Sequence, residues 1–175
     1  KKSEELGLKN THFETPHGLD SDEHYTTAYE LALLSNYALN NKIFTKIVGT
    51  KNYTILINGQ QKQLTNTNEL LGNFDGIYGI KTGFTNGANR CLVTACKRND
   101  IDVICVVLGA DTKKFRTQDS IKLLNYVFDN FKSINIDNII SSEFENWKEN
   151  NLNNIVLNKS ISKNINLKVN PSYNN

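Results

Sequence analysis

Lys81, Thr82 and Gly83 form the group of residues in this chain whose types and spacing could do chemistry. They lie in an apolar, β-prone run, residues 77–85, which is followed at once by the Asn-Gly pair 86–87. An ammonium and a hydroxyl side by side can hold an anion such as a carboxylate, and a residue without Cβ lets a ligand approach the backbone. A lone triplet of this kind is also compatible with a solvated strand end, so its meaning depends on its context.

The residues around the triplet predict that it sits late on a strand. β-branched and aromatic residues favour an extended backbone, and Asn-Gly is typical of a type I′ hairpin turn. Because successive side chains of a strand point to opposite faces, Lys81 can face a cleft while Thr82 presents its hydroxyl near the rim.

The segments after the triplet predict the rest of a sheet. Runs 90–98 and 102–109, separated by a turn at Asn99-Asp100, are expected to pair as antiparallel strands. The second run is apolar at consecutive positions and should be covered on both faces. The apolar stripe of a helix over about 114–131 would provide one cover.

The segments before the triplet are expected to include a loop, a helix and a hairpin. Residues 6–20 predict a loop that rims the cleft, in which His17 either approaches the substrate or holds the loop by hydrogen bonds. A helix should begin after Thr26 or Thr27. Residues 44–64 favour strands, with a hairpin of 53–57 and 61–64 around an Asn-Gly turn.

The cysteines and histidines do not suggest a metal site. Cys91, Cys96 and Cys105 show neither Cys-x-x-Cys nor Cys/His ligand spacing, and the three histidines are dispersed. We expect buried free thiols. Cys91 and Cys96 should face opposite sides of their strand, so at most one of them could pair with Cys105.

The composition is that of a globular domain. Of 175 residues 38% are hydrophobic and 22% charged. The net charge of +2 implies no particular partner, and we expect no nucleic-acid partner. There is no signal peptide and no apolar run long enough to cross a bilayer, so we expect any export signal or anchor to lie outside this segment. The absence of Met and the helix-like opening residues predict that the chain begins inside a domain.

Several collinear motifs resemble the penicillin-sensitive D-alanyl-D-alanine carboxypeptidases, the low-molecular-mass penicillin-binding proteins of serine peptidase family S11. The resemblance runs from about residue 6 to residue 131. The stretches that carry it, besides the triplet, are Leu6-Gly7-Leu8-Lys9-Asn10-Thr11-His12-Phe13, Pro16-His17-Gly18-Leu19, His24-Tyr25-Thr26-Thr27-Ala28-Tyr29-Glu30-Leu31-Ala32-Leu33-Leu34, Asn66-Thr67-Asn68, Cys91-Leu92-Val93, Leu108-Gly109-Ala110, Arg116, Asp119-Ser120 and Leu123-Leu124-Asn125-Tyr126.

The resemblance implies three catalytic motifs in a fixed order: Ser-x-x-Lys with the nucleophile, Ser-x-Asn, and Lys-Thr-Gly. Only the third lies in this chain where it should. Ser133-Ile134-Asn135 and the Ser-x-x-Lys of residues 160–163 match the other two patterns, but they follow Lys81 in reversed order, and we interpret them as chance matches.

The implied fold class is α+β, a partial β-lactamase/transpeptidase-like fold in which helices cover an antiparallel sheet. The N-terminal strands and nucleophile helices of that fold are expected to be absent from the chain. Residues 1–131 would form the C-terminal half of the catalytic domain. Residues 132–175 would be a linker and the start of a β-rich domain, with short strands at 153–157 and 165–169.

The implied function is a serine-type D-Ala-D-Ala carboxypeptidase that trims peptidoglycan stem peptides by acyl transfer and is inhibited by β-lactams. Lys81, Thr82 and Gly83 would be catalytic, and Arg116, Phe84 and His17 would contact the substrate. The resemblance implies no metal or organic cofactor. It implies a bacterial, extracytoplasmic location and a partner, the missing N-terminal half, without which the fragment would be inactive.

One departure and two alternatives remain. The family usually has Ala-Gly where this chain has Ala88 followed by Asn89; Asn tolerates a left-handed backbone, so the turn can survive. A serine β-lactamase would share the triplet and the fold. A non-catalytic peptidoglycan-binding module could retain a carboxylate pocket.

Overall fold

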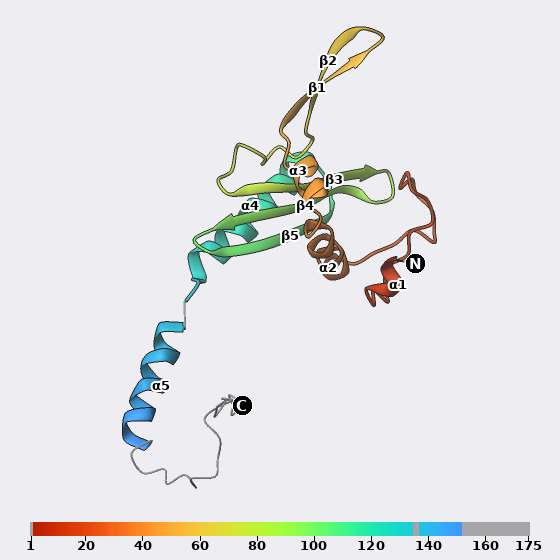
Figure 1. The fold of residues 1–175 in the computed structure, drawn as a ribbon. Coiled ribbons are helices and arrows are strands. Elements are labelled where there is room, and N and C mark those ends of the chain that lie inside the picture. The colour runs from red at the N-terminus through yellow and green to blue at the C-terminus, as the bar shows by residue number, and fades with distance from the viewer. Residues whose placement is uncertain (1, 135–136, 152–175) are drawn as a thin grey trace, which may run out of the picture. The chain divides into compact units, whose positions relative to one another are not determined.

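The computed structural model describes residues 2–134 and 137–151 (Figure 1). It divides into two compact units, Lys1–Ser133 and Ile134–Asn175. The second unit is described by one helix, α5 (Asp137–Asn151). The strands expected at 153–157 and 165–169, and Ser160, lie outside the described residues.

The first unit is built on a three-stranded antiparallel sheet in the order β3-β4-β5. The strands are β3 (Ile77–Thr85), β4 (Asn89–Arg98) and β5 (Ile101–Ala110), which confirms the predicted run of antiparallel neighbours. Asn99 and Asp100, both with positive φ, make the tight turn between β4 and β5. Because β3 is the first strand in this order, the Lys-Thr-Gly triplet lies on an edge strand.

The turn between β3 and β4 differs from the prediction. A type I′ turn would need positive φ at both Asn86 and Gly87, and neither has it. The left-handed residue is Asn89, with φ of 55°. Asn adopts this conformation more readily than most residues because its short polar side chain can hydrogen-bond locally. The Asn that departs from the family pattern is thus compatible with the backbone of this turn.

Helices cover both faces of the sheet, as the apolar β5 predicted (Figure 1). On one face α4 (Lys113–Asn130) packs over β4 and β5, and the buried side chains are those of Cys96, Cys105 and Leu124. The two thiols are free, as expected. The predicted helix over 114–131 is confirmed.

The other face is covered by α2 (Ala28–Leu39) and α3 (Lys42–Val48). Thr27 caps α2 by accepting a hydrogen bond from the backbone N–H of Glu30, so the second of the two predicted caps is the correct one. The buried residues of this face are Ile80, Val93 and Ala95.

The prediction of strands from residue 44 onward was wrong for residues 44–48, which lie in helix α3. Asn41 accepts hydrogen bonds from the N–H groups of Ile43 and Phe44 and starts α3 there. The hairpin that follows, β1 (Asn52–Ile57) and β2 (Gln60–Thr65), is confirmed and extends away from the sheet in Figure 1.

The remaining described element of the first unit is the short helix α1 (Lys2–Glu5). Among the described residues, no helix combines the length and the apolar character needed to cross a membrane.

Candidate active site

A cavity of about 1130 Å³ opens beside β3, and it brings together side chains from segments far apart in the chain. Its walls come from the loop before α2, the segment after β2, the end of the sheet and the first turn of α4. All six residues that the sequence suggested for the site line this one cavity: His17, Lys81, Thr82, Gly83, Phe84 and Arg116.

The Lys-Thr-Gly triplet lies in the extended backbone of β3. The exposed Lys81 donates a hydrogen bond from Nζ to the carbonyl oxygen of Thr82 at 2.6 Å. A Cβ built on Gly83 would approach the Cβ of Cys91 to 3.7 Å, an ordinary van der Waals distance. The fold itself therefore has room for a side chain at Gly83, so any need for glycine there would come from a ligand.

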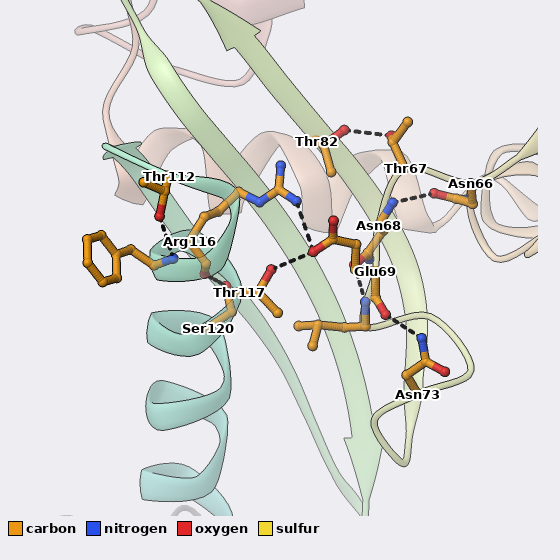
Figure 2. A network of polar contacts seen from close by, with 12 residues as sticks. Asn66, Thr67, Asn68, Glu69, Asn73, Thr82, Thr112, Arg116, Thr117 and Ser120 are labelled. Atoms are coloured by element: carbon orange, nitrogen blue, oxygen red, sulfur yellow. Dashed lines mark hydrogen bonds and ion pairs between the residues drawn. The ribbon is translucent and has the colours of Figure 1, made fainter.

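The hydroxyl of Thr82 is held by the segment that follows β2. Thr82 Oγ1 lies 2.6 Å from Thr67 Oγ1, and Figure 2 shows the two hydroxyls facing each other. Asn66 and Asn68 fix the backbone on either side of Thr67. The Asn66 side chain donates hydrogen bonds to the backbone carbonyls of Val48, at 3.1 Å, and Thr50, at 3.0 Å. The buried Asn68 side chain donates to the carbonyl oxygen of Gly79 at 2.9 Å.

This supporting role was not assigned from the sequence. The signal was present in Asn66-Thr67-Asn68, because two Asn residues flanking a Thr favour a loop stabilised by side-chain-to-backbone hydrogen bonds. Its contact with β3 could not be read from local sequence.

Arg116 is buried, with only 3% of its surface exposed, although it lies in the first turns of α4. Its Nη2 is 3.9 Å from Glu69 Oε2, and Glu69 also accepts a hydrogen bond from Thr117 at 3.1 Å (Figure 2). The Nε of Arg116 has no hydrogen-bond partner among the described residues. Arg116 lines the cavity, and a guanidinium is suited to an anion because it carries several N–H donors.

The loop that carries His17 is held partly by His17 itself. Its Nδ1 accepts a hydrogen bond from the N–H of Leu19 at 3.2 Å and lies 3.1 Å from Thr15 Oγ1. The structure thus shows the contacts expected of a loop-holding His17 and also places the side chain on the cavity wall.

Asp20 joins the same loop to the turn between β3 and β4, a contact that sequence reasoning missed. Its Oδ2 accepts a hydrogen bond from the N–H of Gly87 at 3.0 Å. A hydrogen bond with the Thr85 side chain, together with the Gly87 N–H, lowers the pKa of the Asp20 carboxyl below its ordinary value. The rim of the cavity is therefore tied to the end of the triplet strand.

Glu30 fixes the beginning of that loop on α2. Its buried carboxylate accepts hydrogen bonds from the N–H of Asn10 at 2.9 Å and from Thr11 Oγ1 at 2.5 Å. The hydrogen bond from Thr11 is the main reason that the pKa of Glu30 is lowered.

The family model for D-alanyl-D-alanine carboxypeptidase, peptidase S11, matches residues 1–112. The chain therefore belongs to the D-alanyl-D-alanine carboxypeptidase family. Arg116 lies beyond the matched residues.

Individual relatives agree with this assignment. The chain is 38% identical to D-alanyl-D-alanine carboxypeptidase DacF of Bacillus subtilis over 134 residues, which are 76% of this chain and 34% of that protein. Against DacA of Escherichia coli strain K12 it is 38% identical over 130 residues, 74% of this chain and 32% of the relative. The chain spans about a third of the length of these relatives.

Solved structures show the same partial match to the fold. The crystal structure of the Streptomyces K15 DD-transpeptidase superimposes with a TM-score of 0.68 at 34% identity and covers 73% of this chain and 51% of that one. A D-alanyl-D-alanine carboxypeptidase from Mycobacterium tuberculosis gives a TM-score of 0.67 at 26% identity, with 74% and 51% covered. The predicted fold class, an α+β transpeptidase-like fold present in part, is confirmed.

Proposed function

We propose that this chain supplies the Lys-Thr-Gly part of a serine-type D-Ala-D-Ala carboxypeptidase site that trims peptidoglycan stem peptides by acyl transfer. The observation that carries the proposal is that the triplet and the buried Arg116 line one and the same cavity. In this proposal residues 1–131 belong to the catalytic domain and residues 132–175 follow it as a linker and the start of another domain.

The terminal carboxylate of the peptide would be bound by Thr82 and Arg116. A guanidinium can donate two parallel hydrogen bonds to a carboxylate, and Arg116 lines the same cavity as Thr82. Glu69 and Arg116 form a long ion pair, with 3.9 Å between Oε2 and Nη2, which is beyond normal hydrogen-bond distance. Selection of a free C-terminal carboxylate is what a carboxypeptidase requires.

The chemical step would use a serine from a segment carrying the Ser-x-x-Lys motif. Its oxygen attacks the carbonyl between the two D-alanines, the C–N bond breaks, and the terminal D-alanine leaves with a proton on its nitrogen. Water then hydrolyses the acyl-serine ester. A β-lactam would acylate the same serine, and the scheme needs no metal or organic cofactor.

Residues of β3 would stabilise the charges that develop. The backbone N–H of Phe84 would help form the oxyanion hole, and Lys81 would supply positive charge and order the proton network of the site. Lys81 now donates to the Thr82 carbonyl, so its ammonium is already close to the strand edge along which the peptide would lie. His17 would contact the peptide from the rim.

The whole enzyme would act outside the cytoplasm in a bacterial cell envelope, with any membrane association provided by segments outside this chain. Its partners would be the stem peptide, β-lactams and the N-terminal half of the catalytic domain.

The test is the intact mass of the purified material after incubation with a penicillin. We expect no adduct on this chain and an acyl adduct on any co-purifying chain that carries Ser-x-x-Lys. Lys81→Ala should slow formation of that adduct. An adduct mapped to a serine of this chain would overturn the assignment, and peptide binding without acylation of any chain would favour a non-catalytic binding module.

A further inference from the structure

Arg90 and Phe84 form a second cationic feature on the wall of the cavity. The guanidinium carbon of Arg90 lies 3.4 Å from the centroid of the Phe84 ring, so the cation is stacked on an aromatic face. A cation–π contact of this kind uses none of the guanidinium N–H groups as hydrogen-bond donors to a carboxylate, so they stay available to a ligand. Arg90 is half-buried, and among the described residues it forms no ion pair with a carboxylate.

The strand register places Arg90 on the same face of the sheet as Thr82. Cross-strand partners in an antiparallel pair share a face, and Phe84 pairs with Arg90. Thr82 and Phe84 are two residues apart and therefore also share a face, about 7 Å apart along the strand. A ligand bound at Thr82 and extended along β3 would reach Arg90.

The charges that line the cavity favour a ligand with more than one negative group. Four cations line it, Lys81, Arg90, Lys113 and Arg116, against two carboxylates. Asp20 accepts from the Gly87 N–H, and Glu69 accepts from Thr117 and forms a long ion pair with Arg116, so neither carboxylate is paired with Arg90. A single substrate carboxylate at Thr82 and Arg116 leaves Arg90 without an anionic partner.

We propose that Arg90, held by the Phe84 ring, binds a second carboxylate of the substrate, located upstream of the D-Ala-D-Ala unit. This inference rests on the proposed function and names a substrate class for it: peptides with an acidic group as well as the terminal carboxylate. An extended peptide advances about 7 Å over two residues, so the residue before D-Ala-D-Ala is the one whose side chain reaches Arg90.

The experiment compares two peptides that differ by one charge, acetyl-Glu-D-Ala-D-Ala and acetyl-Gln-D-Ala-D-Ala, by calorimetric titration of the full 175-residue chain. We expect the Glu peptide to bind about fivefold more tightly at low salt, the scale of one partly exposed charge-assisted contact. Raising the ionic strength should reduce the ratio, because salt screens such contacts.

Substitutions test whether Arg90 causes the preference for the Glu peptide. Arg90→Gln should abolish the preference for the Glu peptide, and Arg90→Lys should retain only part of it because the planar fork is lost. Lys62→Gln is the matched control: it removes an exposed cation from β2, outside the cavity, and should keep the full preference. Thermal unfolding of each variant shows whether it has folded.

The outcomes separate this inference from the function on which it rests. Equal affinity for the two peptides on the unmodified chain would overturn the role of Arg90 while leaving the carboxylate site intact. A preference that survives Arg90→Gln would also overturn it. Failure of both peptides to bind would overturn the proposed function and this inference together.

Discussion

The hydroxyl of Thr82 lies 2.6 Å from the hydroxyl of Thr67, which is 15 residues earlier in the chain. Thr82 belongs to the edge strand β3 and faces Thr67 (Figure 2). Thr67 lies between Asn66 and Asn68, whose side chains donate hydrogen bonds to the backbone carbonyls of Val48 and Gly79. The orientation of the triplet threonine is therefore set by a contact outside its own strand.

Thr67→Val should weaken peptide binding and leave the fold intact. Valine keeps the shape of threonine but removes the hydroxyl that orients Thr82. Because Thr67 is exposed, we expect the free energy of unfolding to fall by no more than about 0.5 kcal/mol. Affinity for a D-Ala-D-Ala peptide should fall several-fold. Thr67→Ser, which keeps a hydroxyl, should retain most of the affinity, and equal losses in both variants would contradict this role.

Gly83→Ala should separate ligand binding from stability. The added Cβ meets only the Cβ of Cys91 at 3.7 Å, so the free energy of unfolding should stay the same or rise by up to about 1 kcal/mol. Peptide affinity should drop at least tenfold if the ligand packs against this backbone. Denaturant unfolding and calorimetric titration measure the two quantities.

Gly76→Ala is the matched contrast. Gly76 has φ of 80°, and an added Cβ would lie 2.4 Å from the carbonyl oxygen of Lys97, so this variant should be clearly destabilised.

Unchanged peptide binding by a folded Gly83→Ala protein would show that no ligand approaches β3 at residue 83.

Asp20 should make stability depend on pH in the acidic range. Its pKa is lowered in the folded chain from an ordinary value of 3.8, chiefly by the hydrogen bond with Thr85. The stabilisation it provides is therefore fully present above about pH 4 and is lost as the pH falls through the lower, folded-state pKa.

Urea unfolding of the unmodified chain and of Asp20→Asn at pH 7 and pH 3 tests this. The variant should be less stable at pH 7, and the difference should shrink at pH 3. Asp22→Asn, in the same loop, serves as the control. A stability difference for Asp20→Asn that does not change with pH would show that the carboxylate charge is not what ties the loop to the turn.

The three cysteines should differ in reactivity. Burial raises the pKa of the Cys105 thiol to about 11 and also raises the pKa of Cys96, whereas Cys91 is half-buried and lines the cavity. Iodoacetamide at pH 8 should therefore modify Cys91 first, and the other two only after unfolding. Peptide mapping by mass spectrometry measures this. Equal rates at all three sites would contradict the packing of α4 on the sheet.

Local sequence was sufficient for much of the fold. The strands from 77 to 110, the turn between β4 and β5, and helix α4 follow from periodicity and turn chemistry, which act over a few residues. The α3 helix was missed because Phe44, Ile47 and Val48 read as β-prone, while the Asn41 cap and packing against β3 decide the outcome. The β3–β4 turn was placed correctly, but its left-handed residue was not.

The site was predictable only where a motif marked it. Lys81 to Phe84 came from the triplet, and Arg116 and His17 came from the family resemblance. Asp20 and Glu69 had no such signal, because their partners lie 67 residues away at Gly87 and 48 residues away at Thr117. Contacts of that range depend on how the elements pack, which a single sequence does not specify.

The most direct test of the central claim compares acetyl-D-Ala-D-Ala with its C-terminal amide, using backbone NMR of the ¹⁵N-labelled chain. If Thr82 and Arg116 bind the terminal carboxylate, the free acid should shift the amide signals of residues 81–84 and 116, and the amide should leave them nearly unchanged. Arg116→Gln should remove the response to the acid. Equal shifts for the two peptides, or none near β3 for either, would contradict the claim that this cavity is a carboxylate site for D-Ala-D-Ala.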